Sequence, residues 1–213
     1  MARRLPEVEA FDDDAYEEQC QIGSFWSASR LLVAASLFLY GTFTFAYFYL
    51  RALNNHNDWR VGGQHPSMIL GTLVALCIVG AAIVHYGSAR RLQIGALLDW
   101  QSGAAVSLGL VATACGLQIW EMTRLPFSPA SSGYTSVFIA WMPIYIVYML
   151  GQFYWLETLI AQSIVRPRSV MLRRLDEGPL IIPLFGANVE SYILFSQFMA
   201  VGAILIWILF YVL

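Results

Sequence analysis

Hydrophobic residues gather in five long runs along the chain, and shorter polar stretches separate these runs. A helix that crosses a membrane needs about 20 consecutive, mostly apolar residues. Each run reaches or approaches that length, so we predict an all-α fold, a polytopic bundle of five transmembrane helices. The predicted spans cover residues 31–50, 66–86, 102–120, 137–163 and 191–213.

The first 25 residues have a different pattern, because they are polar and carry many carboxylates. We predict that residues 1–25 form a solvated, acidic tail and that residues 26–213 form the transmembrane domain. A docking segment for a basic partner is the alternative interpretation of the tail. Its acidic residues are Glu7, Glu9, Asp12, Asp13, Asp14, Glu17 and Glu18.

Composition supports a membrane protein. The chain is 58% hydrophobic and 12% charged, whereas soluble domains carry about 25% charged residues.

All 12 basic residues are Arg, and arginine concentrates in cytoplasmic loops. With a cytoplasmic N-terminus, only Arg51, Arg60 and Arg124 lie outside and the other nine lie inside. We therefore expect the N-terminus in the cytoplasm and the C-terminus outside.

Few side chains could carry redox chemistry. His56 and His65 lie in an expected outer loop, and only His85 lies in a span. One imidazole cannot ligate a heme on both sides or complete a copper site. We therefore expect no metal-binding or catalytic residue in this chain. We interpret His85 as a hydrogen-bonded residue at a helix end, or as a contact to lipid or to a partner helix. We interpret Cys20, Cys77 and Cys115 as packing residues.

Two acids lie in or beside spans, where carboxylates are costly unless they meet protein or water. Glu121 is either a hydrogen-bonded helix end, with Arg124 at i+3, or an acid at a subunit or lipid contact. For Glu157 we favour a position that reaches interfacial water. The fourth span also carries a polar and aromatic stripe, which we assign to a helix-facing surface rather than a substrate path. Its members are Tyr145, Tyr148, Gln152, Trp155 and Gln162.

The connection between the third and fourth spans holds the most specific pattern. It has Gln and Glu three residues apart, then Pro-Phe, then Tyr-x-Ser-x-Phe as the next span begins. This pattern resembles subunit III of the heme-copper terminal oxidases (cytochrome c and quinol oxidases), in a divergent, five-helix bacterial form. Its residues are Gln118, Glu121, Pro126, Phe127, Gly133, Tyr134, Ser136 and Phe138. Weaker matches are Ala35-Ser36, the residues 45–48, Trp59, Val84-His85, the residues 190–192 and Phe195.

Several polar positions of that family are replaced in this chain. Leu37 stands where the family usually has a membrane-embedded Glu. Tyr145 and Tyr148 stand at two histidine positions, and Leu194 and Gln197 stand at a His and an Asp position. Any role of those family groups in proton uptake is therefore not transferred to this chain.

The resemblance implies a non-catalytic subunit in the bacterial inner (cytoplasmic) membrane. Its partners would be catalytic subunit I, on which it would pack, and subunit II, and the heme and copper would be in these partners. It would retain phospholipids and support assembly and sustained proton uptake, with no nucleic-acid partner. We expect its lipid or subunit contacts at Glu121, His85, Trp59, Arg51, Tyr145, Tyr148 and Gln152.

Two other functions stay open. The lost polar positions suit a subunit III-like accessory protein of another complex, such as nitric oxide reductase. An independent small membrane transporter or enzyme is the third possibility. The single span histidine, the few acids and the absence of an inverted repeat in the sequence weigh against it.

Overall fold

The computed structural model describes residues 13–54, 59–60, 62, 65–165, 172–175, 178–181 and 183–213. Five helices in this part of the chain are long and apolar enough to cross a membrane, which confirms the predicted all-α five-helix membrane bundle. They are α1 (Asp13–Leu53), α2 (Met68–Gln93), α3 (Leu97–Thr123), α4 (Gly133–Val165) and α6 (Pro183–Trp207), the last continued by the π-helical turn η1 (Ile208–Val212). A short antiparallel hairpin of β1 (Leu172–Leu175) and β2 (Gly178–Ile181) lies between α4 and α6 in the sequence.

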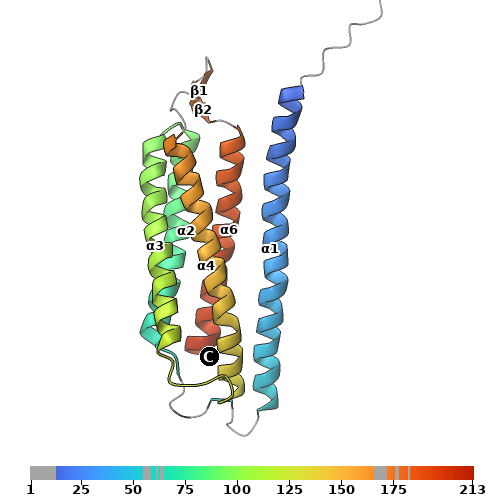
Figure 1. Ribbon diagram of the computed structural model, residues 1–213, viewed down its shortest axis with the longest axis vertical. Helices are drawn as coiled ribbons and strands as arrows, with labels where there is room; N and C mark the ends of the chain where they lie inside the picture. Colours follow the sequence, from blue (N-terminus) through green and yellow to red (C-terminus); the bar gives the residue numbers. More distant parts are fainter. Residues whose placement is uncertain are drawn as a thin grey trace, which may run out of the picture.

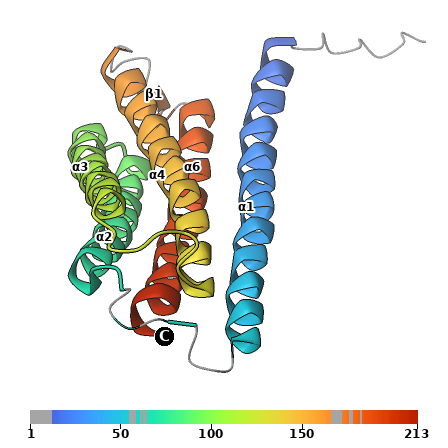
Figure 2. The ribbon, with the colours of Figure 1, turned by 60° about the horizontal axis from the view of Figure 1, so that its bottom comes forward.

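Four helices form a close group, and α1 lies along one side of it (Figure 1). The most extensive contact joins α2 to α3, α2 also packs on α6, and α1 contacts mainly α6 and α4. The turned view shows the same arrangement (Figure 2). We call the end of the bundle near β1 and β2 the hairpin end, and the opposite end, with η1, the C-terminal end.

The helices extend beyond the predicted apolar spans. α1 begins at Asp13, so the predicted tail is helical from that residue on, and residues 1–12 of the tail lie outside the described residues. With 41 residues, α1 is about 62 Å long at 1.5 Å per residue, roughly twice the thickness of a hydrocarbon core. Hydropathy marks only the lipid-facing part of such a helix, which explains the short prediction.

The turn between α2 and α3 is tight because of one glycine. Gly95 has a φ of 82°, in the left-handed region that costs glycine little. Its N–H donates to the carbonyl of Leu92 at 2.8 Å, which closes the end of α2. At the other end of α2, the hydroxyl of Ser67 accepts a hydrogen bond from Leu70 N–H and caps the helix.

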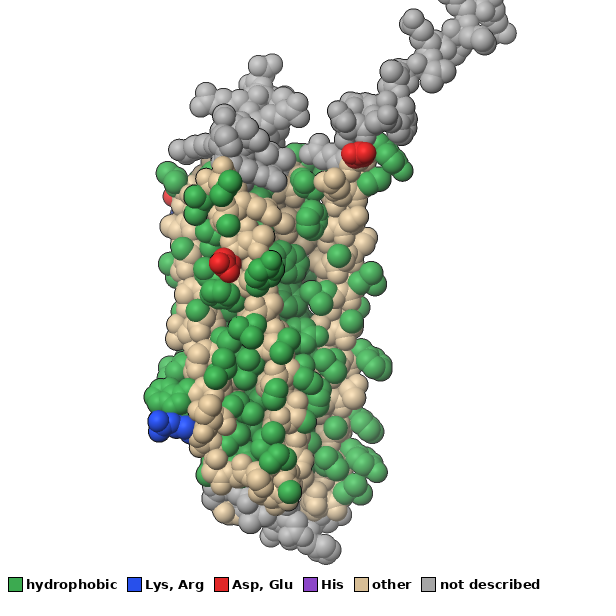
Figure 3. Space-filling view, in the orientation of Figure 1, with side chains coloured by type: hydrophobic (Ala, Val, Ile, Leu, Met, Phe, Trp, Pro, Cys, Tyr) green, Lys and Arg blue, Asp and Glu red, His purple; other side chains and the backbone are tan. Residues whose placement is uncertain are grey.

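Aromatic rings fill much of the space between α1, α4 and the end of α6. Tyr40 and Trp141 meet edge to face at 5.5 Å, and Trp141 meets Phe210 at 5.6 Å. Such pairs favour one arrangement of the helices, since their geometry is more specific than that of aliphatic contacts. The outer surface is also largely hydrophobic on the face seen in Figure 3, with isolated charged groups, as suits a bundle in lipid.

Candidate functional site

Glu121 is enclosed at the C-terminal end of the bundle, in the last turn of α3. Only 3% of the residue is exposed. Its Oε2 accepts hydrogen bonds from Gln118 Nε2 at 3.0 Å and from the Tyr211 hydroxyl at 2.5 Å. Arg124, the i+3 partner suggested by the sequence, forms no ion pair with Glu121 in the described structure. Its guanidinium instead lies over the ring of Trp120, 5.4 Å from the ring centroid. Glu121 therefore faces protein and joins α3 to η1.

The carbonyl of Phe210 in η1 is held by two donors from other segments. Arg60 Nη2 donates to this oxygen at 3.1 Å, and the Tyr134 hydroxyl donates to it at 2.6 Å. The Arg60 guanidinium also lies over the Tyr134 ring, 4.4 Å from its centroid. The last carbonyls of a helix lack donors within the helix. Arg60 and Tyr134 supply such donors and fix η1 against α4.

Trp59 completes this end of the bundle. Its ring meets Tyr47 at 5.0 Å and Tyr134 at 5.9 Å, both edge to face. A Cβ at Gly133 would lie 3.1 Å from the Trp59 ring and 2.9 Å from Asn54 Nδ2, so a larger residue at the start of α4 would displace these two side chains. We call Arg60, Gln118, Glu121, Tyr134, Phe210 and Tyr211 the C-terminal cluster.

His85 lies near the hairpin end and is fully enclosed. Its ring packs edge to face on Tyr192 at 4.6 Å and on Trp100 at 6.3 Å. Neither imidazole nitrogen has a hydrogen-bond partner among the described residues. The expectation of a hydrogen-bonded residue near the helix end is therefore not met: His85 is buried between α2, α3 and α6.

The polar and aromatic stripe of α4 faces other helices, as predicted. The Tyr148 hydroxyl accepts a hydrogen bond from Ser36 Oγ of α1 at 2.9 Å. Trp155 Nε1 donates to Asn188 Oδ1 of α6 at 2.8 Å. Tyr145 is 1% exposed and lies in the main aromatic core. The stripe thus connects α4 to the helices on either side.

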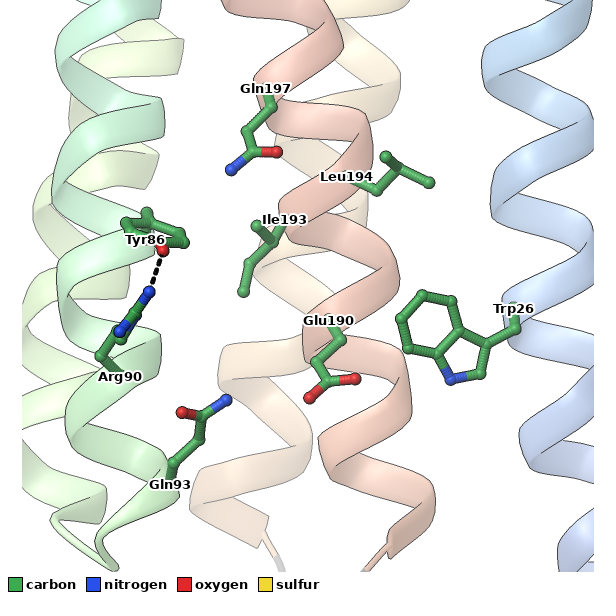
Figure 4. Close-up of a pocket in the computed structure, with 8 residues that line it drawn as sticks. All are labelled: Trp26, Tyr86, Arg90, Gln93, Glu190, Ile193, Leu194 and Gln197. Carbon is green, nitrogen blue, oxygen red and sulfur yellow. Dashed lines mark hydrogen bonds between the residues drawn. The ribbon is translucent and has the colours of Figure 1, made fainter.

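A pocket of 490 Å³ opens between α1, α2 and α6 near the hairpin end. Figure 4 shows Arg90 and Gln93 of α2 and Glu190 of α6 around one space, with Trp26 of α1 on its far side. The Tyr86 hydroxyl accepts a hydrogen bond from Arg90 Nη2. Ile193 and Leu194 line the same pocket. The pocket therefore has charged side chains, Arg90 and Glu190, as well as an apolar lining.

The seven expected contact residues divide into two groups. Arg51 and Tyr148 are half-buried and can reach a lipid or a partner. The other five are buried against other residues of this chain, so the structure places them inside the bundle. A contact of these five with lipid or another subunit stays a prediction. These five are Trp59, His85, Glu121, Tyr145 and Gln152.

Several residues that shape these sites were not singled out from sequence. From sequence, Arg60 and Arg90 were considered only as charges that set the membrane orientation. In the structure, Arg60 donates a hydrogen bond to η1 and Arg90 lines the pocket. Glu190 entered only through a weak match. Tyr211 lies 90 residues from Glu121 in the sequence, and a local sequence pattern does not predict a partner at that separation.

Among the described residues, no group of three or more His, Cys, Asp or Glu side chains could hold a metal ion. Of the histidines outside the spans, His65 is exposed and His56 lies outside the described residues. The sequence matches no protein-family model and no curated protein.

Proposed function

We propose that this chain is a non-catalytic, subunit III-like component of a respiratory heme-copper terminal oxidase. Its partners would be catalytic subunit I and subunit II, which would hold heme and copper and reduce oxygen while moving protons. The chain would retain phospholipid and support assembly and sustained proton uptake. Its membrane would be the inner (cytoplasmic) membrane of a bacterium.

This proposal rests on one observation: the residues that match the subunit III pattern contact one another and η1 in the structure. Gln118 bonds Glu121 directly, and Tyr134 stacks with Phe138 at 6.3 Å. Both pairs meet η1, through Tyr211 and Phe210. Residues from one short sequence pattern thus lock α3 and α4 onto the end of α6. A pattern with this role suits a subunit that supplies architecture rather than chemistry.

The pocket between α1, α2 and α6 supports a role in retaining phospholipid. Arg90 can bind a headgroup phosphate, since guanidinium groups pair well with phosphate oxygens. Glu190 lies across the same space, and the half-buried ring of Trp26 is of the kind that concentrates at membrane interfaces. Apolar side chains continue from this mouth along α6, where acyl chains would lie.

We further propose that the outward face of α1 meets the catalytic partner. α1 is the least enclosed of the five spanning helices in the described structure. Large apolar side chains stand out along it, including Leu31, Phe38 and Phe45. A helix that is apolar and largely uncovered is suited to packing on another membrane subunit, where close packing rather than hydrophobicity decides association.

Photo-crosslinking within a purified complex tests this proposal. A photoreactive amino acid at Phe38 is compared with one at Val147 of α4, because both positions are exposed. After purification in mild detergent through a tag on this chain, we expect Phe38 to crosslink to a heme-bearing subunit and Val147 not to do so. A partner with nitric oxide reductase activity would favour the alternative accessory role. A chain that purifies alone and transports a solute would contradict both.

A further inference from the structure

A group of polar side chains that do not line the pocket lies inside the bundle near the hairpin end, at the opposite end from the C-terminal cluster. It comprises His85 of α2, Trp100 and Ser107 of α3, Gln152 of α4 and Tyr192 of α6, which we call the His85 cluster. Trp100, Ser107, Gln152, His85 and Tyr192 are all at most 1% exposed. Four helices therefore contribute buried polar atoms to this part of the bundle.

The members of the His85 cluster are close neighbours. The His85 ring meets Tyr192 at 4.6 Å and Trp100 at 6.3 Å. Gln152 and Ser107 approach the Tyr192 hydroxyl without forming a hydrogen bond of good geometry. Ser107 Oγ instead donates to the carbonyl of Ala81, one helical turn before His85, at 3.0 Å.

Most polar atoms of the cluster have no partner among the described residues. These are both imidazole nitrogens of His85, both amide atoms of Gln152, the Tyr192 hydroxyl and the Trp100 indole nitrogen. Buried polar groups in native proteins are nearly always hydrogen-bonded. In a membrane they cannot turn to bulk solvent, so an unmade hydrogen bond is costly there. A group of this size points to a bound molecule.

The chemistry of the cluster indicates which molecule fits. Trp100 offers only a donor, whereas a neutral His85, Gln152 and Tyr192 each offer both donors and acceptors. The cluster contains no charged side chain that would select an anion or a metal cation. Water both donates and accepts, and a buried water makes about three hydrogen bonds. We propose that the His85 cluster binds internal water molecules that bridge His85, Gln152 and Tyr192.

The cluster lies a short distance from one end of α2. His85 precedes the end of α2 at Gln93 by eight residues, which is about 12 Å along the helix. The imidazole would then exchange protons with water although it is fully enclosed. It would thus behave as a hydrated internal group, unlike an aromatic ring in a dry core.

Solid-state NMR of the protein in lipid bilayers tests the proposal. The chain has three histidines, so ¹⁵N-histidine labelling of His56→Gln/His65→Gln leaves His85 as the one labelled imidazole. We expect magnetisation from water to reach its nitrogens at short mixing times. Gln152→Leu should slow this transfer at least twofold, and Gln162→Leu, half-buried on the same helix, should leave it unchanged.

Two results would overturn the proposal. One is an imidazole that receives no magnetisation from water and shows a direct hydrogen bond to Gln152 or Tyr192. The other is a higher unfolding midpoint for Gln152→Leu, since removal of an unpaired amide from a dry core stabilises a protein. A lower midpoint supports bound water. If Gln152→Leu does not fold, the transfer measured in the protein with native Gln152 decides alone.

Discussion

The hydrogen bond between Tyr211 and Glu121 should be the main polar link between η1 and α3. We test it with Tyr211→Phe, Glu121→Ala and the double variant. Tyr211→Phe removes only a hydroxyl and keeps the ring that packs on Phe138. Glu121→Ala removes the shared acceptor and leaves both the Tyr211 hydroxyl and the Gln118 amide without it.

The magnitude follows from geometry and environment. Interhelical hydrogen bonds in membrane proteins contribute about 0.6 kcal/mol on average and at most about 1.7 kcal/mol. The 2.5 Å distance from the Tyr211 hydroxyl to Glu121 Oε2 is at the short end of the range for O–H···O hydrogen bonds, so we expect a value in the upper part of this range. We therefore expect a coupling free energy of about 1–1.5 kcal/mol between the two substitutions.

Unfolding in mixed micelles with increasing dodecyl sulfate, followed by tryptophan fluorescence, gives the four free energies of the cycle. Effects of the two substitutions that simply add would refute the reasoning. In the assembled oxidase, Glu121→Ala should reduce retention of this chain more than it changes the initial rate of oxygen consumption. An immediate loss of turnover in a fully assembled complex would contradict a structural role for Glu121.

Two further predictions concern helix contact and lipid. A Cβ at Gly71 would lie 2.2 Å from the Tyr211 ring, whereas nothing lies within 4 Å of one at Gly109. Gly71→Ala should therefore lower the free energy of unfolding by about 1–3 kcal/mol. Gly109→Ala should leave it unchanged or raise it by at most about 1 kcal/mol in the same micelle assay, because alanine favours a helix more than glycine does. Arg90→Gln should weaken phospholipid binding about fivefold, the loss of about 1 kcal/mol for one basic group. Lipid phosphate per protein after detergent washing measures this, Arg124→Gln serves as the control, and equal losses would contradict the headgroup site.

Hydropathy alone predicts the five helices, because only spanning helices satisfy the backbone across a lipid layer. The same pattern places α4's Tyr148 and Trp155 on a helix-facing surface, since unpartnered polar groups are costly in lipid. It cannot mark where a helix ends in water, which is why the start of α1 at Asp13 was missed.

The partners of the buried polar groups could not be predicted from sequence. Glu121 was identified as a candidate, but its partner Tyr211 depends on how α3 and η1 meet in space. The carbonyl that Arg60 and Tyr134 hold likewise depends on the π-helical turn at the end of α6. His85 was recognised as unusual, and only the fold shows that Gln152 lies near the same ring system.

The most direct test of the proposed role is to locate the heme after this chain is separated from its complex. The complex is purified through a tag on this chain, and the chain is then stripped from it with stronger detergent. We predict that heme co-purifies with the tagged chain and gives the reduced-minus-oxidised spectrum of an oxidase. After the chain is stripped, all of this heme should remain with the partner subunits. Heme or copper on the stripped chain, or a tagged chain that brings no heme-bearing partner, would contradict the account.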